Sequence, residues 1–473
     1  MNPLSLAHPL APALALTHTA PPPLLPTRAA GLHGAASDPL KSARSKRAAA
    51  ARLACLAPGG ACAAAGGASA PALKNFTRLL LKNAEHTWGE SLGHYTDNQN
   101  WTNAQFAAAR AASPSYAAEI MASWDEQRAY GLEAALQALQ VGAGHPLAPA
   151  VAAAWADLVP DGAPALAGWA PLAPGAAVAV GPWALQFDAA TGALAGLVDR
   201  GQSPPVAWTT AASGGGGGAA SVGLGLAQYN TYSAPDVFAW EAAYNLQGPN
   251  REFGRDASFA SAGTTTAAVA QRLLGLWQRN SSSSGGGASF LVRADFSPAE
   301  LHTDYDAPAE LYLQYDVPAA SGAGAPINVT LTLLNKTATR LVEALFLRFN
   351  ASCSGAAPAA WRVSKLGSWV DPFDVQPGGN QRHHGVDAGV AARCASGATL
   401  LIGAPDAPLA AFGAPSLFPV PVDAPADARE GASFLLSGQL WNTNYPMWYP
   451  WLPADSGLRL RFSLSSLPPG AGP

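Results

Sequence analysis

The stretch from Leu440 to Tyr449 (LWNTNYPMWY) concentrates side chains that suit a polyhydroxylated ligand. It carries four aromatic rings, two side-chain amides and a proline in ten residues. Aromatic rings cover the apolar faces of a sugar, and amides both donate and accept hydrogen bonds with hydroxyl groups. Trp441, Asn444 and Trp448 are therefore candidate substrate-binding residues. The alternative interpretation is a strand and turn that close a β-domain, with the amides bonded to backbone.

Two histidine clusters also have side chains that could do chemistry. His302 and Asp304 form a His-x-Asp pattern, which places both side chains on one face of a strand. His383-His384 with Asp387 combines ligand-type side chains, but the neighbouring glycines predict a solvated loop there. The sequence contains no phosphate-binding glycine loop with its lysine, no Gly-x-Ser-x-Gly elbow and no Cys-x-x-Cys.

Composition narrows the class of protein. The chain has 473 residues, enough for two or three domains, and its net charge of -4 gives no sign of a nucleic-acid-binding surface. No run of about 18 strongly apolar residues appears, so we expect no membrane span. Cys55 and Cys62 lie in low-complexity sequence and are expected to be unpaired or absent from the mature protein. Cys353 and Cys394 lie in β-rich sequence, where they either pair or remain buried thiols.

Residues 1–73 lack the pattern of a folded domain. They contain one carboxylate, Asp38, among six basic side chains and many Ala, Pro, Leu and Gly residues. This composition predicts a leader that is either disordered or an organellar targeting segment. Six Asn-x-Ser/Thr sequons point instead to the secretory route; they begin at Asn75, Asn100, Asn280, Asn328, Asn335 and Asn350. The expected location is thus secretory or extracellular, or organellar.

Patterning divides the rest of the chain in two. Residues 74–165 are predicted to form a small helical bundle, with short helices over 75–81, 103–111 and 149–158. A longer helix is expected from Ser113, as N-cap, and Pro114 to about residue 140. Residues 170–468 are predicted to form a large antiparallel β-sandwich, because short β-rich pieces alternate with turn residues. The clearest strands are expected over 183–187, 311–315, 327–334, 341–349, 398–402, 433–436 and 458–463.

Seven segments in series resemble the C-terminal part of α-mannosidase-like glycoside hydrolases of family 38/57 type. They are more similar still to the uncharacterised domain-of-unknown-function family 5054. The segments are Leu80–Gly89, Ser123–Tyr130, Phe187–Gly192, Asn335–Arg340, Lys365–Pro372, Asp406–Leu409 and Trp441–Tyr449. They span about residues 75 to 465.

The resemblance implies a glycoside-hydrolase-like protein that acts on carbohydrate. Family 38 members place a metal-binding catalytic α/β barrel before a helical bundle and a sandwich of the galactose-mutarotase type. This chain would supply the bundle and the sandwich while the barrel is apparently missing, so we expect it to be inactive alone. A divalent metal, zinc, is implied only for a full-length form. The alternative is a carbohydrate-binding or scaffolding protein without catalysis.

The resemblance also implies site residues in the segment Glu85-His86-Thr87-Trp88. Glu85 and His86 are the catalytic candidates, His86 is the candidate metal ligand, and Trp88 is a candidate substrate-binding platform. The alternative for His86 is a buried histidine bonded to backbone. A third hypothesis is an enzyme site within the sandwich, as in mutarotases, that uses His302, Asp304 or Glu343.

Overall fold

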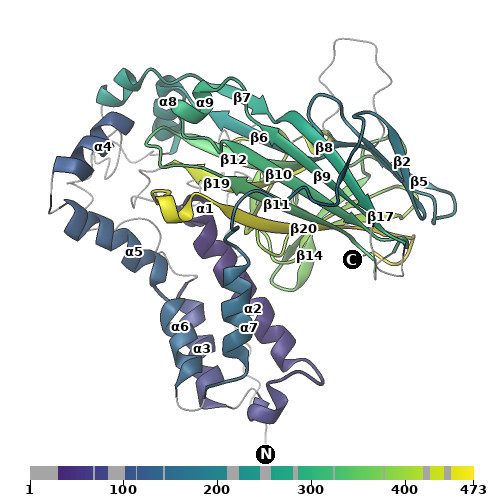
Figure 1. Ribbon diagram of the computed structural model, residues 1–473, viewed down its shortest axis with the longest axis horizontal. Coiled ribbons are helices and arrows are strands. Elements are labelled where there is room, and N and C mark those ends of the chain that lie inside the picture. Colours follow the sequence, from purple (N-terminus) through teal and green to yellow (C-terminus); the bar gives the residue numbers. More distant parts are fainter. Residues whose placement is uncertain are drawn as a thin grey trace, which may run out of the picture.

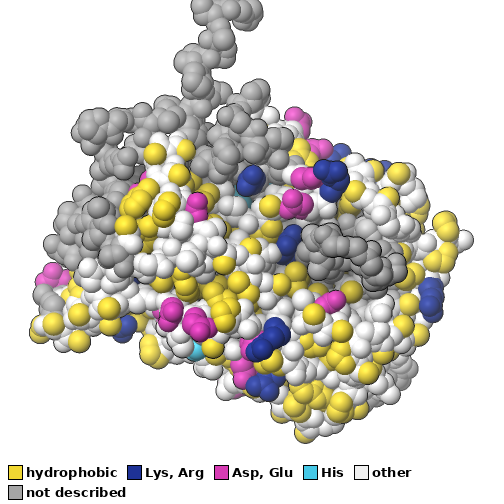
Figure 2. Space-filling view, turned by 90° about the horizontal axis from the view of Figure 1, so that it is seen from above, with side chains coloured by type: hydrophobic (Ala, Val, Ile, Leu, Met, Phe, Trp, Pro, Cys, Tyr) yellow, Lys and Arg dark blue, Asp and Glu magenta, His cyan; other side chains and the backbone are white. Residues whose placement is uncertain are grey.

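The computed structural model describes two parts, one helical and one built from strands (Figure 1). The residues described are 30–67, 70–83, 102–112, 114, 116–141, 144–209, 223–244, 257–280, 286–322, 325–376, 379–418, 427–440 and 449–472. Among them, no helix combines the length and the hydropathy needed to cross a membrane. On the face drawn in Figure 2, basic and acidic side chains stand near one another in small groups rather than in a field of one sign.

Helices precede the first strand. Four of them form a bundle whose core contains Phe76, Leu132, Leu139 and Trp155, and this bundle projects from one end of the sheets (Figure 1). The helices are α1 (Ala30–Ser37), α2 (Pro39–Leu56), α3 (Pro71–Lys82), α4 (Asn103–Ala112), α5 (Ala122–Ala129), α6 (Glu133–Gln140) and α7 (Leu147–Ala156), with a π-helical turn at Tyr116–Met121; the bundle comprises α2, α3, α6 and α7.

The structure corrects the expectation of a disordered leader over residues 1–73, because the described part, from residue 30 on, forms helices α1 and α2. The targeting alternative stays a prediction. Helix α2 starts with Asp38 as N-cap, whose carboxylate accepts a hydrogen bond from the backbone N–H of Lys41, and with Pro39 at the first helical positions. Lys41 and Arg47 are both buried, although an isolated basic helix would keep such side chains in water. Their partners come from distant parts of the chain, so the local sequence does not reveal this helix.

Cys55 and Cys62 form a disulfide, which corrects the expectation that they are unpaired. They lie seven residues apart, at the end of α2 and in the turn that follows. Cys353 and Cys394 are also bonded, so the pairing alternative holds for them. All four cysteines of the chain are therefore oxidised.

Replacing Cys55 and Cys62 together by alanine should lower the free energy of unfolding by about 2.5 kcal/mol, because a short closed loop of roughly eight residues is released in the unfolded chain. Urea unfolding, followed by far-ultraviolet circular dichroism, would measure the loss. Equal midpoints and equal slopes for the variant and the wild-type protein would contradict this prediction.

The other helix predictions hold in part. Helices α3 and α4 coincide with the expected 75–81 and 103–111, and α7 with 149–158. The expected long helix up to residue 140 is wrong, because it is divided into the π-helical turn, α5 and α6. Gly131 has φ 77°, a left-handed conformation that interrupts a helix, and a side chain there would press on the backbone of Asn83.

Two ten-stranded antiparallel sheets follow the helices. The first, the β10 sheet, has the order β1-β8-β9-β10-β11-β20-β17-β16-β13-β14. Its strands are β1 (Ala170–Pro171), β8 (Arg272–Asn280), β9 (Ala288–Asp295), β10 (Glu310–Val317), β11 (Ile327–Leu334), β13 (Ala360–Lys365), β14 (Ser368–Val370), β16 (Gly389–Arg393), β17 (Thr399–Gly403) and β20 (Leu458–Leu467).

The second, the β12 sheet, has the order β15-β18-β19-β12-β6-β4-β3-β2, with β5 beside β4 and β7 beside β6. Its strands are β2 (Ala177–Val180), β3 (Trp183–Phe187), β4 (Leu194–Asp199), β5 (Val206–Thr209), β6 (Leu224–Thr231), β7 (Ala267–Ala270), β12 (Glu343–Phe349), β15 (His383–Gly385), β18 (Leu409–Phe412) and β19 (Ala432–Gln439). Helices α8 (Ala234–Tyr244) and α9 (Glu300–Thr303) interrupt the strand region.

The two sheets face each other across one apolar core, which confirms a mainly β, two-layered architecture. Phe187 of the β12 sheet lies 5.3 Å from Phe290 of the β10 sheet, measured between ring centroids. Phe349 and Phe462 make a second contact between the layers, at 5.8 Å. All seven strands expected from the sequence are present, and those over 183–187 and 327–334 have the predicted bounds.

A buried ion-pair cluster joins the bundle to the β10 sheet. The Asp406 carboxylate accepts hydrogen bonds from the Arg47 guanidinium on α2, at 2.8 and 2.9 Å, and from the Arg461 guanidinium on β20, at 3.0 Å. Its side chain is 0% exposed and that of Arg47 is 1% exposed. Burial acts to raise the pKa of Asp406, but the two arginines outweigh it and lower the pKa.

Candidate functional site

An open groove lies on the outer face of the β10 sheet, where it meets the segment after α7. Its cavity volume is about 430 Å³, within the range of roughly 300–1,000 Å³ that is usual for small-molecule sites. The lining residues are Asp161, Gly162, Ala163, Pro164, Leu291, Tyr312, Gln314, Thr330, Thr332 and Arg459. We call this feature the outer groove.

The pleat of the sheet explains why these side chains gather. Residues at alternate positions of β10 point outward, so Tyr312 and Gln314 share the outer face while Leu311 and Leu313 enter the core. Directly opposite residues in an antiparallel pair point to the same face. Register then sets Tyr312 beside Thr332, and Thr332 beside Arg459.

A second row runs beside the first. Gln314 is opposite both Leu291 and Thr330. Tyr312 and Thr332 are buried at the bottom of the outer groove, Gln314, Thr330 and Arg459 are half-buried, and Asp161 is exposed at the rim. The outer groove thus presents hydroxyl, amide, guanidinium and carboxylate groups over a short distance.

Ion pairs and hydrogen bonds fix the polar side chains of the outer groove. The Tyr312 hydroxyl donates to Glu310 at 2.6 Å, and Arg293 donates to the other oxygen of the same carboxylate at 2.6 Å. Burial and the Glu310 carboxylate raise the pKa of Tyr312 to about 12, so its phenol keeps its proton at neutral pH. The Gln314 amide donates to Asp316, and Arg459 donates to Asp157.

Two tryptophans, Trp169 and Trp277, lie near the β1–β8 edge of the β10 sheet. We call them the tryptophan edge. Trp277 of β8 is opposite Leu291, which lines the outer groove. Its indole ring lies over Gly275, where an added Cβ would overlap the ring. Trp169, just before β1, lies 4.5 Å from the guanidinium carbon of Arg279, measured to the ring centroid. Both tryptophans are half-buried, so part of each ring stays open to solvent.

The six site residues expected from the sequence lie outside the described residues: Glu85, His86, Trp88, Trp441, Asn444 and Trp448. The nearby described residues Asn103 and Trp451 approach one buried cluster. The Asn103 amide donates to Asp306 at 3.0 Å, and Trp451 lies 5.4 Å from the Lys336 ammonium. Lys336 in turn forms an ion pair of 3.1 Å with Glu343, and both side chains are fully buried.

The remaining candidates have structural partners. His302 and Asp304 lie in and just after the short helix α9, not on a strand, so the predicted strand face is wrong. The His302 ring Nδ1 is 2.6 Å from the Ala307 carbonyl oxygen. His383 and His384 are buried on β15, where a solvated loop was expected. This strand pairs with β18, and the His383 ring Nε2 lies 2.6 Å from the Ser416 carbonyl oxygen. Burial lowers the pKa of each histidine to about 4.

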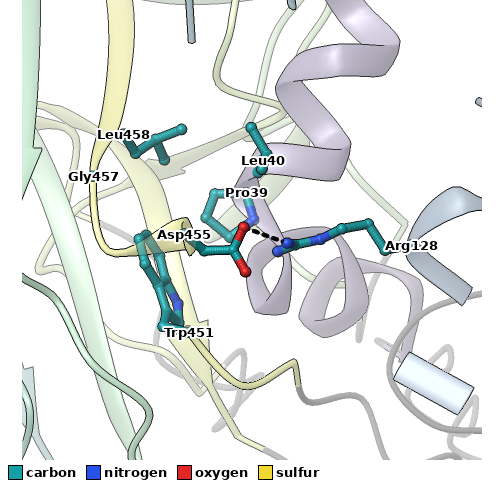
Figure 3. Close-up of a pocket in the computed structure, with 7 residues that line it drawn as sticks. All are labelled: Pro39, Leu40, Arg128, Trp451, Asp455, Gly457 and Leu458. Carbon is teal, nitrogen blue, oxygen red and sulfur yellow. Dashed lines mark ion pairs between the residues drawn. The ribbon is translucent and has the colours of Figure 1, made fainter. Parts of the chain in front are cut away.

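A smaller cavity between the bundle and β20 holds no ligand-sized space. Its volume is about 10 Å³, at the lower limit of the space needed to hold a single water molecule. Arg128 crosses it to pair with Asp455 at 2.6 Å (Figure 3) and pairs with Asp38 at 2.7 Å. Its guanidinium carbon is 3.5 Å from the Tyr449 ring centroid. This contact connects the helices and strands and is not a binding site.

The described residues do not fit the zinc that the resemblance implies. Within them, no three His, Cys, Asp or Glu side chains converge as a metal site would require. We therefore derive no chemistry through a metal.

The fold and the outer groove define a two-layered antiparallel β protein with an N-terminal helical bundle and an open polar surface site. A family model described as "Domain of unknown function (DUF5054)" matches residues 35–323, more than half of the chain, and the chain therefore belongs to this family. The match contains Trp277, Tyr312 and Gln314 but ends before β11. A search of curated proteins finds no match to the chain.

The sequence contains a local signal for the outer groove. In Glu310–Val317 and Ile327–Leu334, apolar residues alternate with polar ones. This pattern is typical of a strand with one buried and one solvent-exposed face. Four of the polar positions in these segments line the outer groove: Tyr312, Gln314, Thr330 and Thr332. Alternation alone does not show which strands are neighbours. The pairing of the strands in the structure is therefore needed to show that these residues lie together.

Proposed function

We propose that this protein acts on carbohydrate as a glycoside-hydrolase-like protein, and that its described part contributes glycan binding through the outer groove. The observation that supports this most is the groove itself, an open site with hydroxyl, amide and charged groups beside a tryptophan edge. Hydroxyl-rich ligands need many hydrogen bonds and a flat apolar surface for the sugar face. The two large antiparallel layers are compatible with a sandwich of the galactose-mutarotase type, which we include in the proposal.

Binding rather than hydrolysis is proposed for the outer groove because hydrolysis usually needs two carboxylates flanking the glycosidic bond. Among the described residues that line it, Asp161 is the one carboxylate. The 473-residue chain is therefore expected to bind glycans without releasing the leaving group of aryl glycosides. Turnover of an aryl α-mannoside that persists in the Asp161→Asn variant would place catalysis elsewhere in the chain.

Replacing Trp277 by alanine should weaken glycan binding by about 1–3 kcal/mol, roughly 5- to 150-fold in Kd, because a stacking surface is lost. A glycan array would identify a ligand, and calorimetric titration would give the Kd of each variant. Gly275→Ala should weaken binding as well, since the added methyl group displaces the Trp277 ring while keeping it in the protein.

Trp369→Ala is the matched control. Trp369 is also half-buried and lies on β14, at the opposite edge of the β10 sheet. It should leave the Kd unchanged. Equal losses from Trp277→Ala and Trp369→Ala, or no binding to any glycan, would overturn the assignment of the outer groove.

A further inference from the structure

The pairing of every cysteine bears on where the protein matures. The Cys55–Cys62 disulfide joins the end of α2 to the turn after it. The Cys353–Cys394 disulfide links two positions that are 41 residues apart in the strand region. No cysteine is left as a thiol. Disulfides of this kind form and persist in oxidising compartments and are rare where thiols are kept reduced.

The exposure of the sequon asparagines is an independent observation. Asn75 is exposed on α3, and Asn280 at the end of β8. Asn328 is exposed on the outer face of β11, and Asn335 in the turn after that strand. An attached glycan is bulky and hydrophilic, so it needs an asparagine that faces solvent.

We propose that this protein matures in the secretory pathway and carries N-linked glycans on Asn75, Asn280, Asn328 and Asn335. The donor is a lipid-linked oligosaccharyl diphosphate. A bond forms between the asparagine Nδ2 and the anomeric carbon C1, the bond from C1 to the phosphate oxygen breaks, the lipid diphosphate leaves, and Nδ2 loses one proton to a base. No oxidation or reduction occurs in this step.

Asn350 provides an internal contrast. It also begins a sequon, but it is half-buried after β12, and Gly431 packs against it so closely that a Cβ on that glycine would overlap the Asn350 backbone. The Asn350 backbone N–H also donates to the Gly223 carbonyl. This crowding leaves less space for a bulky glycan on Asn350 than on the four exposed asparagines, so we expect Asn350 to be unmodified.

The test uses full-length protein purified from its source cells, so that no foreign signal peptide decides the route. Peptide-N-glycosidase treatment in heavy-oxygen water converts each glycosylated asparagine to a labelled aspartate, which peptide mass spectrometry locates. Alkylation without reduction, carried out in denaturant so that buried thiols also react, detects any free thiol in the same sample. We expect label at Asn75, Asn280, Asn328 and Asn335, no label at Asn350 and no alkylated cysteine.

Each contrary result is decisive. An absence of label at all four exposed asparagines would overturn the proposal, as would alkylation of all four cysteines in the denatured, unreduced protein. Label at Asn350 alone would overturn the assignment of sites by exposure. Glycan binding at the outer groove is measured separately, with the tryptophan variants, on protein from which peptide-N-glycosidase has removed the glycans, because Asn328 lies on the same strand face as the groove residue Thr330.

Discussion

Replacing Lys336 by methionine should lower the free energy of unfolding by about 3–5 kcal/mol, because it leaves the Glu343 carboxylate buried without its cation. Both side chains are 0% exposed, and the ammonium and carboxylate atoms are 3.1 Å apart. Lys336 also lies 5.8 Å from the Tyr229 ring and 5.4 Å from that of Trp451, so its charge is surrounded by protein. Urea unfolding would show the loss as a lower midpoint at an unchanged slope.

Two variants make this result interpretable. The double variant Lys336→Met/Glu343→Leu should recover most of the stability, since apolar residues can replace a whole buried pair at little cost. Lys74→Met, at an exposed position of α3, should change the free energy of unfolding by less than about 0.5 kcal/mol. A double variant as unstable as the single one would show that an unpaired Glu343 is not the cause.

How far the sequence predicts this fold depends on where the partners of each residue lie. The predicted bounds of strands β3 and β11 agree with the structure. The alternation of apolar and polar residues is a local pattern that five to eight residues are enough to show. Helix α2 could not be predicted from local sequence, because its buried Arg47 is paired with Asp406, which lies 359 residues further along the chain. Alanine-rich sequence gave no apolar stripe to compensate.

The segments that suggested the family resemblance include residues that hold the two parts of the fold together. Arg128 pairs with Asp38 and Asp455, and Asp406 pairs with Arg47 and Arg461. These contacts need specific charged side chains at fixed places. The outer groove draws on four neighbouring strands, so its residues form no compact motif, and only the register brings them together.

Replacing Asp406 by asparagine should lower the free energy of unfolding by about 3–5 kcal/mol at pH 7, because the amide cannot balance the buried Arg47 guanidinium. The carboxylate accepts from Arg47 and Arg461 at 2.8–3.0 Å, so two elements, α2 and β20, lose a common partner. Asp157→Asn is the matched control. Asp157 also pairs with Arg47, but it is 45% exposed, and such pairs contribute only about 0–1 kcal/mol.

The pH dependence of this difference follows from the lowered pKa of Asp406. The folded state binds the proton more weakly than the unfolded chain, whose aspartates titrate near 3.8. The stabilisation is therefore fully present above that pH and is lost as the pH falls through the folded-state pKa. Unfolding curves from pH 7 to pH 3 should show the wild-type protein approaching the Asp406→Asn variant only at the acidic end. A difference that stays constant over this range would mean that shape, and not the carboxylate charge, holds the bundle on the β10 sheet.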